Sequence, residues 1–422
     1  MKFMTRLSLV VVVLLALGFA SITAAQEPVQ IDIWLLTDRA ELWDQLIADF
    51  NAENPDIVAT GSYRSTDAHK ESMRQVINTD AAPDVMFTWG GAGLFGFYVE
   101  TGGVESLDST YESLNWADRF SQATIDNATW NGTRYGMPFR SRTMGLYYRR
   151  DLFEQAGITA IPTTYEELIA VNDQLVAAGI IPLALGGKFS WMPMRLLDSL
   201  VELTCGAELH DDLKYFRASW TDNECTTEAF VEFKVWVDNY MPPDFLGIDP
   251  EPGARIPVYT GQAAMMYEGD WMINTFPADG QDMANYGFFH FPADTTRVSF
   301  FGEMLLISST SSDAEKAAAI RFLDWMSSQP TQEANLGEFG GLVPVTNVAV
   351  SPDADPLVLS INQQLNVAGG IYLPADQAFP LQVVTEGYWA AQDGVIAGTI
   401  DPVDAAAVVQ ASIDRYIEAN PS

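Results

Sequence analysis

Strand-like and helix-like segments alternate along almost the whole chain, and this order constrains the fold more than any other feature. Residues 29–34 alternate between apolar and polar side chains, as in a half-buried strand. The next apolar residues recur at helical spacing: Leu42, Trp43, Leu46, Ile47 and Phe50. A strand near 57–60, a helix near 69–78 and a buried strand at 84–88 follow. This βαβαβ order predicts an α/β protein whose parallel or mixed sheet is covered by helices.

The same order returns further along the chain. Strands are expected at 180–185, 263–267 and 300–308, with a helix near 227–240. Four helix starts are predicted from capping residues: Asp38 with Glu41, Thr164 with Glu167, Ser312 with Glu315, and Asp401 followed by Pro402.

The N-terminus predicts a signal peptide over residues 1–25. Lys2 and Arg6 precede an apolar run at 7–20, and small residues stand before a cut ahead of Gln26. A membrane anchor is the alternative, but the apolar run is short for a span. We therefore expect secretion across the cytoplasmic membrane to a periplasmic or other extracytoplasmic location. No cysteine lies near the cut, so no lipid anchor is expected.

The chain is strongly acidic. It has 22 Lys and Arg against 56 Asp and Glu, a net charge of −34. Such a negative field disfavours nucleic acid, anionic lipid and polyanionic substrates, and it does not choose among neutral ligands. The simplest interpretation is a solvated acidic surface that keeps an exported protein soluble.

Only two cysteines are present, Cys205 and Cys225. Export to an oxidising compartment favours a disulfide between them, which would close the polar loop 206–224. Two buried free thiols are the alternative. Two cysteines and three histidines provide no pattern for a structural zinc site, and we expect no metal and no cofactor.

The segment 135–158 combines several structural elements. It reads as extended chain, then a strand, then a short helix that starts at Asp151 and stops at Gly157. Arg140 and Arg142 lie in the extended part, where no helix needs them.

Motifs along nearly the whole chain resemble those of the family 1 extracellular solute-binding proteins, the sugar receptors of ABC importers. Each motif is loose, but they occur in the family's order: 83–87, 89–91, 98–103, 107–108, 135–158, 164–168, and Gly261-Gln-Ala-Ala-Met265 with Gly269 and Trp271 behind it.

The resemblance implies a two-lobed periplasmic-binding-protein clamshell with a ligand cleft between the lobes. Three crossovers would join them, near 138–143, 299–307 and 335–342. Lobe 1 would comprise 26–139 plus 305–337, and lobe 2 would comprise 140–304 plus 338–422. The protein would capture a mono- or oligosaccharide and deliver it to an ABC transporter permease, and we expect a monomer.

Sugars stack their apolar faces on aromatic rings, so tryptophans at strand ends and loops are the first candidates for the site. Trp89 ends a strand before Gly90-Gly91, and Trp191 lies in an expected loop after a strand. Trp271 and Trp389 match cleft aromatics of the family. Packing in the core is the alternative for all four, and is expected for Trp43, Trp236 and Trp325, which follow helical patterns.

Sugar hydroxyls also need planar polar groups that donate and accept hydrogen bonds. The candidates are Asp38, Arg140, Arg142, Asp270, Glu303 and Gly341. Asp38 is also expected to cap the first helix. Arg142 could grip vicinal hydroxyls or form a salt bridge across the hinge, and Glu303 could bind a hydroxyl or pair with either arginine. Gly341 would allow close approach to the backbone or act in a hinge. We expect Arg142→Ala to weaken ligand binding and leave the fold intact.

Two other functions stay open. A secreted carbohydrate-active enzyme needs two carboxylates, and 56 acids do not exclude that pair. The chain shows no G-x-S-x-G, H-E-x-x-H or phosphate-loop motif, so we expect no enzyme. A receptor for glycerol phosphate or a polyamine is the second alternative, because arginines suit an anion and an acidic aromatic box suits a cation.

Overall fold

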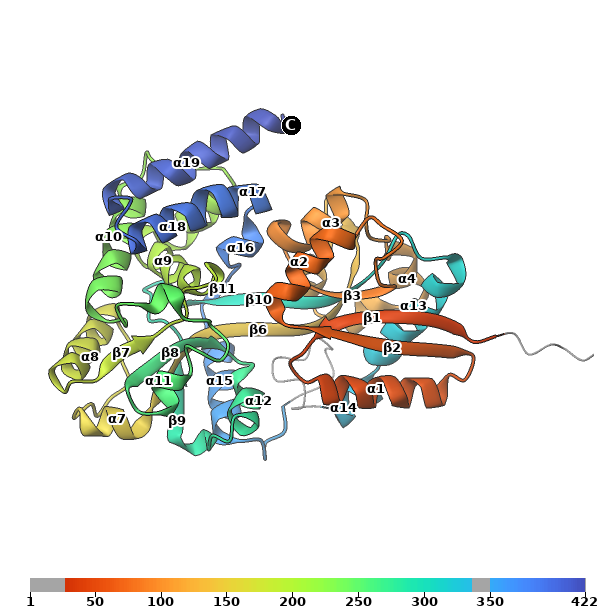
Figure 1. Cartoon of the computed structure of the whole chain (residues 1–422), viewed down its shortest axis with the longest axis horizontal. Helices are drawn as coiled ribbons and strands as arrows, with labels where there is room; N and C mark the ends of the chain where they lie inside the picture. Colours follow the sequence, from red (N-terminus) through yellow and green to blue (C-terminus); the bar gives the residue numbers. More distant parts are fainter. Residues whose placement is uncertain (1–26, 336–349, 422) are drawn as a thin grey trace, which may run out of the picture.

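The computed structural model describes residues 27–335 and 350–421. Two long antiparallel strands, β6 (Gly136–Arg149) and β10 (Arg297–Ile307), run through the middle of the molecule and join its two lobes (Figure 1). The sheet has nine strands in the order β2-β1-β3-β10-β6-β8-β7, with β11 paired to β10 and β9 paired to β6.

Lobe 1 contains the parallel strands β1, β2 and β3, with α1 on one side and α2 on the other in Figure 1. The apolar residues of α1 at helical spacing, Trp43, Leu46, Ile47 and Phe50, are buried. Its elements are β1 (Val29–Leu36), α1 (Ala40–Glu53), β2 (Ile57–Arg64), α2 (Thr66–Val76), β3 (Val85–Trp89), η1 (Ala92–Gly96), α3 (Phe97–Glu100), α4 (Asp108–Ser113), α5 (Trp116–Arg119), α6 (Gln122–Asn127), β4 (Thr129–Trp130), β5 (Thr133–Arg134), α13 (Asp313–Met326) and α14 (Gln329–Ala334).

Lobe 2 is built on β7, β8 and β9 and is covered by α9, α10 and the C-terminal helices (Figure 1). Its elements up to β10 are α7 (Arg150–Gln155), α8 (Tyr165–Ala177), β7 (Ile181–Ala184), α9 (Trp191–Lys214), α10 (Glu224–Asn239), η2 (Phe245–Gly247), α11 (Ile256–Tyr259), β8 (Ala263–Gly269), α12 (Met272–Ala278), η3 (Met283–Asn285) and β9 (Tyr286–Phe289). The rest are α15 (Pro356–Val367), β11 (Gly370–Tyr372), α16 (Ala375–Ala378), α17 (Leu381–Val383), η4 (Val384–Tyr388), α18 (Trp389–Ile396) and α19 (Pro402–Ala419).

A register shift lies where the two shared strands cross between the lobes. Glu303 of β10 is opposite Arg140 of β6, whereas the next residue, Met304, is opposite Pro138. Phe139 is therefore the extra residue of a bulge. A bulge turns neighbouring side chains and tolerates a proline that cannot donate a ladder hydrogen bond. Glu303 and Arg140 are the last pair before this irregularity, directly opposite each other on the two strands.

The predicted fold class is confirmed, and so are the first two crossovers. β10 pairs with β3 of lobe 1 and with β11 of lobe 2, and β6 pairs with β10 at one end and with β8 and β9 of lobe 2 at the other. The third crossover, near 335–342, lies almost wholly outside the described residues, as does the expected signal peptide. The lobe boundaries stay a prediction, since both shared strands continue through them without a break. No helix among residues 27–335 and 350–421 is long and apolar enough to span a membrane.

Two predicted helix caps are wrong. Arg39, with φ 65°, stands between Asp38 and α1, so Asp38 does not cap that helix. Arg149 precedes α7, and Asp151 lies inside its first turn, where it pairs with Arg149 at 2.6 Å. A left-handed residue and a strand that continues to Arg149 are not visible in local sequence spacing.

The other predicted helix ends are confirmed. The Ser312 and Glu315 side chains form a capping box at α13, and Thr164 and Asp401 cap α8 and α19. Gly157 follows α7 with φ +77°.

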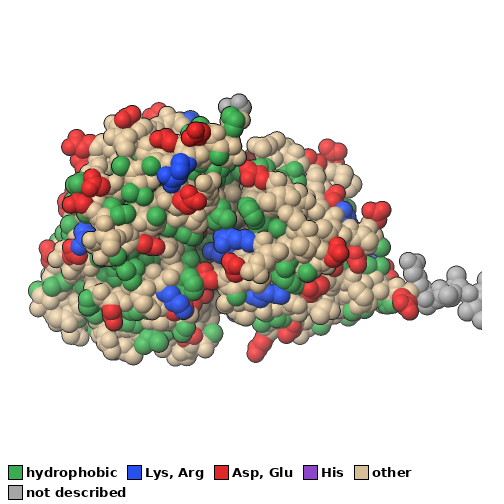
Figure 2. All heavy atoms as spheres, turned by 45° about the horizontal axis from the view of Figure 1, so that its top comes forward, with side chains coloured by type: hydrophobic (Ala, Val, Ile, Leu, Met, Phe, Trp, Pro, Cys, Tyr) green, Lys and Arg blue, Asp and Glu red, His purple; other side chains and the backbone are tan. Residues whose placement is uncertain are grey.

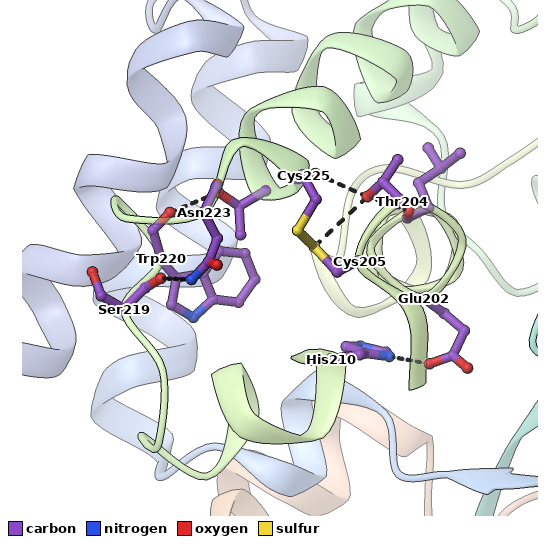
Figure 3. Close-up of a disulfide and its surroundings, with 10 residues drawn as sticks. Glu202, Thr204, Cys205, His210, Ser219, Trp220, Asn223 and Cys225 are labelled. Carbon is purple, nitrogen blue, oxygen red and sulfur yellow. Dashed lines mark hydrogen bonds and ion pairs between the residues drawn. A yellow bond between two sulfur atoms is a disulfide. The ribbon is translucent and has the colours of Figure 1, made fainter. Parts of the chain in front are cut away.

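The disulfide Cys205–Cys225 is present, with Cα atoms 5.1 Å apart (Figure 3). The expected polar loop between the cysteines is only partly a loop. Gly206, with φ 73°, interrupts α9, and the helix then continues to Lys214. His210 in this continuation is buried between Glu202 and Asp198, whose oxygens lie 2.5 and 3.0 Å from its ring nitrogens. The disulfide thus ties the break in α9 to the start of α10.

Candidate functional site

A cavity of about 190 Å³ lies between the two lobes. Figure 2 shows a groove between them with Lys and Arg side chains beside it, whereas Asp and Glu side chains are scattered over both lobes. Six of the predicted site residues line it: Asp38, Trp89, Arg142, Trp191, Trp271 and Glu303. Its location matches the expectation that ligands bind where an α/β sheet is divided between two lobes.

Trp89 is the last residue of β3, and its ring forms part of the lobe 1 wall. The ring packs edge-on against Phe87, with ring centres 4.9 Å apart. Nζ of Lys70 lies 4.7 Å from the Trp89 ring centre, a cation–π contact. Trp89 is therefore both packed in lobe 1 and available at the cavity.

Trp271 forms the opposite wall, in lobe 2. It follows β8, and its indole Nε1 donates a hydrogen bond of 2.8 Å to Glu268. A Cβ at Gly269 would collide with the Trp271 ring, so only glycine lets the ring fold back over the end of β8. The local sequence Glu-Gly-Asp-Trp thus sets the orientation of this ring.

Trp191 also lines the cavity, but not from a loop. It is the first residue of α9, and the predicted loop is wrong at this point. Trp389 is the first residue of α18 and packs against the main core, outside the cavity lining. Trp43 and Trp236 are buried in the core and Trp325 packs against it, as predicted.

The predicted polar residues form one network of ion pairs around the shared strands. Arg140 Nε lies 2.5 Å from Glu303 Oε2, and Arg142 Nε lies 3.3 Å from Glu303 Oε1. Arg142 Nη1 lies 3.2 Å from Asp270 Oδ1, and Arg140 Nη2 lies 3.8 Å from Asp38 Oδ2. Glu303 therefore pairs with both arginines, which was one of its two expected roles.

The residues of this ion-pair network differ in their exposure to solvent. Arg140, Arg142, Asp270 and Glu303 are all buried, whereas the Asp38 side chain is 45% exposed. Burial opposes ionisation of Glu303, but Arg140 and Arg142 together hold its pKa below the usual value. Burial raises the pKa of Asp270 to about 7, against the opposing effect of Arg142. Arg140 and Asp270 lie behind the cavity lining and position Arg142 and Glu303.

Sequence reasoning missed several residues of the lining: Lys70, Arg195, Glu251, Arg255, Asn274 and Phe301. Helical spacing could have indicated two of them. Arg195 is four residues after Trp191 on α9, and Lys70 is four residues after Thr66 on α2, so each shares a helix face with another lining residue. Gly341 lies outside the described residues.

Arg255 is held by two carboxylates. Its Nε lies 2.9 Å from Glu268, and its Nη2 lies 3.4 Å from Glu251. Glu268 therefore binds both Arg255 and Trp271 and joins two parts of the lobe 2 wall. Over the part of the chain that the structure covers, no group of three His, Cys, Asp or Glu side chains could hold a metal ion.

Comparisons with known proteins agree with this architecture. A chitin oligosaccharide binding protein of known structure superposes with a TM-score of 0.82 at 24% identity, over 92% of this chain and 98% of that one. A probable sugar-binding periplasmic protein from Mesorhizobium japonicum is 26% identical over 269 residues, 61% of this chain and 61% of that protein. An uncharacterized ABC transporter extracellular-binding protein from Pyrococcus horikoshii is 24% identical over 250 residues, 58% of this chain and 54% of that protein.

The matches to these two curated relatives span less than two thirds of their length. The family model covers more of this chain, since the model for bacterial extracellular solute-binding proteins matches residues 34–333. Because that match covers well over half of the chain and includes both shared strands and all of the cavity lining, the chain belongs to the bacterial extracellular solute-binding protein family.

Proposed function

We propose that this protein captures a mono- or oligosaccharide in the cavity between its lobes and delivers it to the membrane permease of an ABC transporter. The observation that carries the proposal is the combination of four aromatic rings with planar charged groups in one lining. Trp89, Trp191, Trp271 and Phe301 offer faces for sugar rings. Arg142 and Glu303 offer donors and acceptors for hydroxyls.

Among the predicted site residues, we assign ligand contact to those that line the cavity: Asp38, Trp89, Arg142, Trp191, Trp271 and Glu303. Arg140 and Asp270 act through their ion pairs and are positioning residues. Trp389 has no part in this assignment, because it packs against the main core and lies outside the cavity lining.

The location, oligomeric state and partner of the protein follow from the same function. It acts outside the cytoplasm, without a lipid anchor, as a monomer, and its macromolecular partner is the permease. It is a receptor and not an enzyme: in this proposal the buried carboxylates beside the cavity serve to hold arginines in ion pairs. A polyamine is a poor ligand for this lining, which contains five Lys and Arg side chains against three carboxylates: Arg39, Lys70, Arg142, Arg195 and Arg255, and Asp38, Glu251 and Glu303.

A thermal-shift screen of the purified mature protein tests the function. Saccharides that bind only the folded state raise Tm in a concentration-dependent way, and sorbitol at the same concentration controls for general stabilisation. We expect at least one saccharide to raise Tm at micromolar to millimolar concentration. A shift with spermidine or glycerol phosphate and none with any saccharide would refute the proposal.

A further inference from the structure

One corner of the cavity brings two cationic side chains together from opposite lobes. Lys70 is on α2 of lobe 1, and Arg195 is on α9 of lobe 2. Nζ of Lys70 lies 4.7 Å from the ring centre of Trp89 and 5.6 Å from that of Trp191. The guanidinium carbon of Arg195 lies 5.2 Å from the ring centre of Phe301. We call Lys70, Arg195 and these three rings the cationic corner.

One cation of this corner, Lys70, is less neutralised than its neighbours in the lining. Arg142 lies 3.3 Å from Glu303 and 3.2 Å from Asp270, and Arg255 has Glu268 at 2.9 Å. By contrast, no carboxylate of residues 27–335 and 350–421 lies within the 4.0 Å ion-pair distance of Lys70 Nζ.

Arg195 is paired, but weakly. Nη2 donates a long hydrogen bond of 3.4 Å to Asp376 Oδ2, and Nη1 lies 3.4 Å from Oδ1 without the geometry of a hydrogen bond. Arg195 is only 5% exposed, and its Nε and Nη1 have no hydrogen-bond partner within the described part of the chain. Buried N–H groups nearly always have an acceptor, so Arg195 retains hydrogen-bonding capacity that Asp376 does not use, beside the cavity that Arg195 lines.

We propose that the cationic corner binds a carboxylate of the sugar, which makes the preferred ligand an acidic saccharide with a uronic acid residue. This inference rests on the proposed sugar-binding function. Lys70 offers a cation without an ion pair from lobe 1, and Arg195 adds a guanidinium charge with unused donors from lobe 2. A carboxylate held between the two also draws the lobes together, because each cation belongs to a different lobe.

A carboxylate fits this corner better than a phosphate does. Burial lowers the pKa of Lys70, whereas the carboxylates of Asp376 and Asp67 lie near enough to act in the opposite direction. These two carboxylates already balance the formal charges of Lys70 and Arg195, so they oppose a phosphate monoester, which carries about −1.5 to −2 at neutral pH, more strongly than a singly charged carboxylate. The chain's charge of −34 does not prevent this, because exposed charges are screened beyond a Debye length of about 8 Å in physiological salt.

The test compares matched acidic and neutral sugars by isothermal titration calorimetry. The probes are galacturonate with galactose, glucuronate with glucose, digalacturonate with galactobiose, and glucose 6-phosphate as the phosphate arm. We expect the wild-type protein to bind at least one uronate ten or more times more tightly than its neutral partner, about 1.4 kcal/mol. Lys70→Met should reduce that ratio to within about twofold, since it removes one of two charges that hold the carboxylate.

The matched control is Lys316→Met, which removes the same charge from α13, where Lys316 pairs with Glu105 outside the cavity lining. It should keep the wild-type ratio. Neutral sugars that bind as tightly as their uronates, or glucose 6-phosphate that binds more tightly than glucuronate, would overturn this inference and leave the sugar receptor intact. If no sugar of either kind binds, the proposed function itself fails.

Discussion

The indole Nε1 of Trp271 donates a hydrogen bond of 2.8 Å to Glu268, and the same carboxylate lies 2.9 Å from Arg255. Glu268 is buried at the end of β8, so the ring at the cavity wall is oriented from behind by a residue that does not line the cavity. The lobe 2 wall is therefore organised by one buried carboxylate, and its effect can be separated from that of the ring.

Trp271→Ala should weaken saccharide binding at least about tenfold, because a stacking face and its buried apolar area are lost together. Glu268→Gln keeps an oxygen acceptor for the indole and should weaken binding less, by about threefold. Intrinsic tryptophan fluorescence or calorimetric titration measures both. Equal binding by Trp271→Ala and wild type would remove this ring from the site.

Arg142→Ala should destabilise the fold as well as weaken binding. The sequence predicted an intact fold, but Arg142 is buried between Glu303 and Asp270 and its removal leaves Asp270 without its ion-pair partner. Breaking a buried ion pair in this way costs about 3–5 kcal/mol. Urea unfolding measures the change.

Arg217→Ala is the matched control for that variant. Arg217 is 56% exposed and pairs with Asp212 on the surface, so its loss should cost at most about 1 kcal/mol. Similar free energies of unfolding for the two variants would show that the buried ion pairs contribute little to the stability of the hinge.

Removing the disulfide should destabilise lobe 2. The cysteines are 20 residues apart, and opening a loop of that length costs about 3 kcal/mol in the chain-entropy description. The double variant Cys205→Ala/Cys225→Ala should lower the free energy of unfolding by that amount. The wild-type protein in excess reductant should show the same decrease. An unchanged unfolding midpoint in both samples would contradict this prediction.

His69 should make stability fall as the pH drops from 7 to 5. Its Nε2 lies 2.7 Å from the Phe87 carbonyl oxygen, Nδ1 is buried without a hydrogen-bond partner within the described residues, and burial lowers its pKa from 6.5 to about 4. The unfolded chain therefore binds a proton between these two values and the folded protein does not. Stability from this residue is complete above pH 6.5 and is lost as the pH falls toward 4, and about 2 kcal/mol of it is gone at pH 5.

His69→Gln keeps an N–H donor for Phe87 and has no proton to bind. Urea unfolding at pH 7 and pH 5 should therefore show a smaller loss for the variant than for wild type, by about 2 kcal/mol. His290, whose pKa is also lowered to about 4 by burial, titrates in both proteins and cancels in the comparison. Equal losses would mean that His69 is not the residue responsible.

Much of the architecture was predictable because its causes are local. Apolar periodicity located β1, α1 and β3, capping residues located the starts of α8, α13 and α19, and export favoured the disulfide. The two described crossovers and the positions of Trp89, Trp191 and Trp271 at the cavity came from the family resemblance together with strand ends and glycines. The strands and the helix starts depend on residues within a few positions of one another.

The sequence by itself thus determined an α/β chain with strands at the right places and aromatic rings at their ends. Only the tertiary structure decided which charges meet. Arg140 and Glu303 are 163 residues apart, and they pair because the register of β6 against β10 places them opposite each other, next to the bulge at Phe139. Lys70 and Arg195 belong to different lobes and meet only where those lobes face each other. Contacts of this kind depend on register and packing over the whole sheet, so the local sequence around either partner does not predict them.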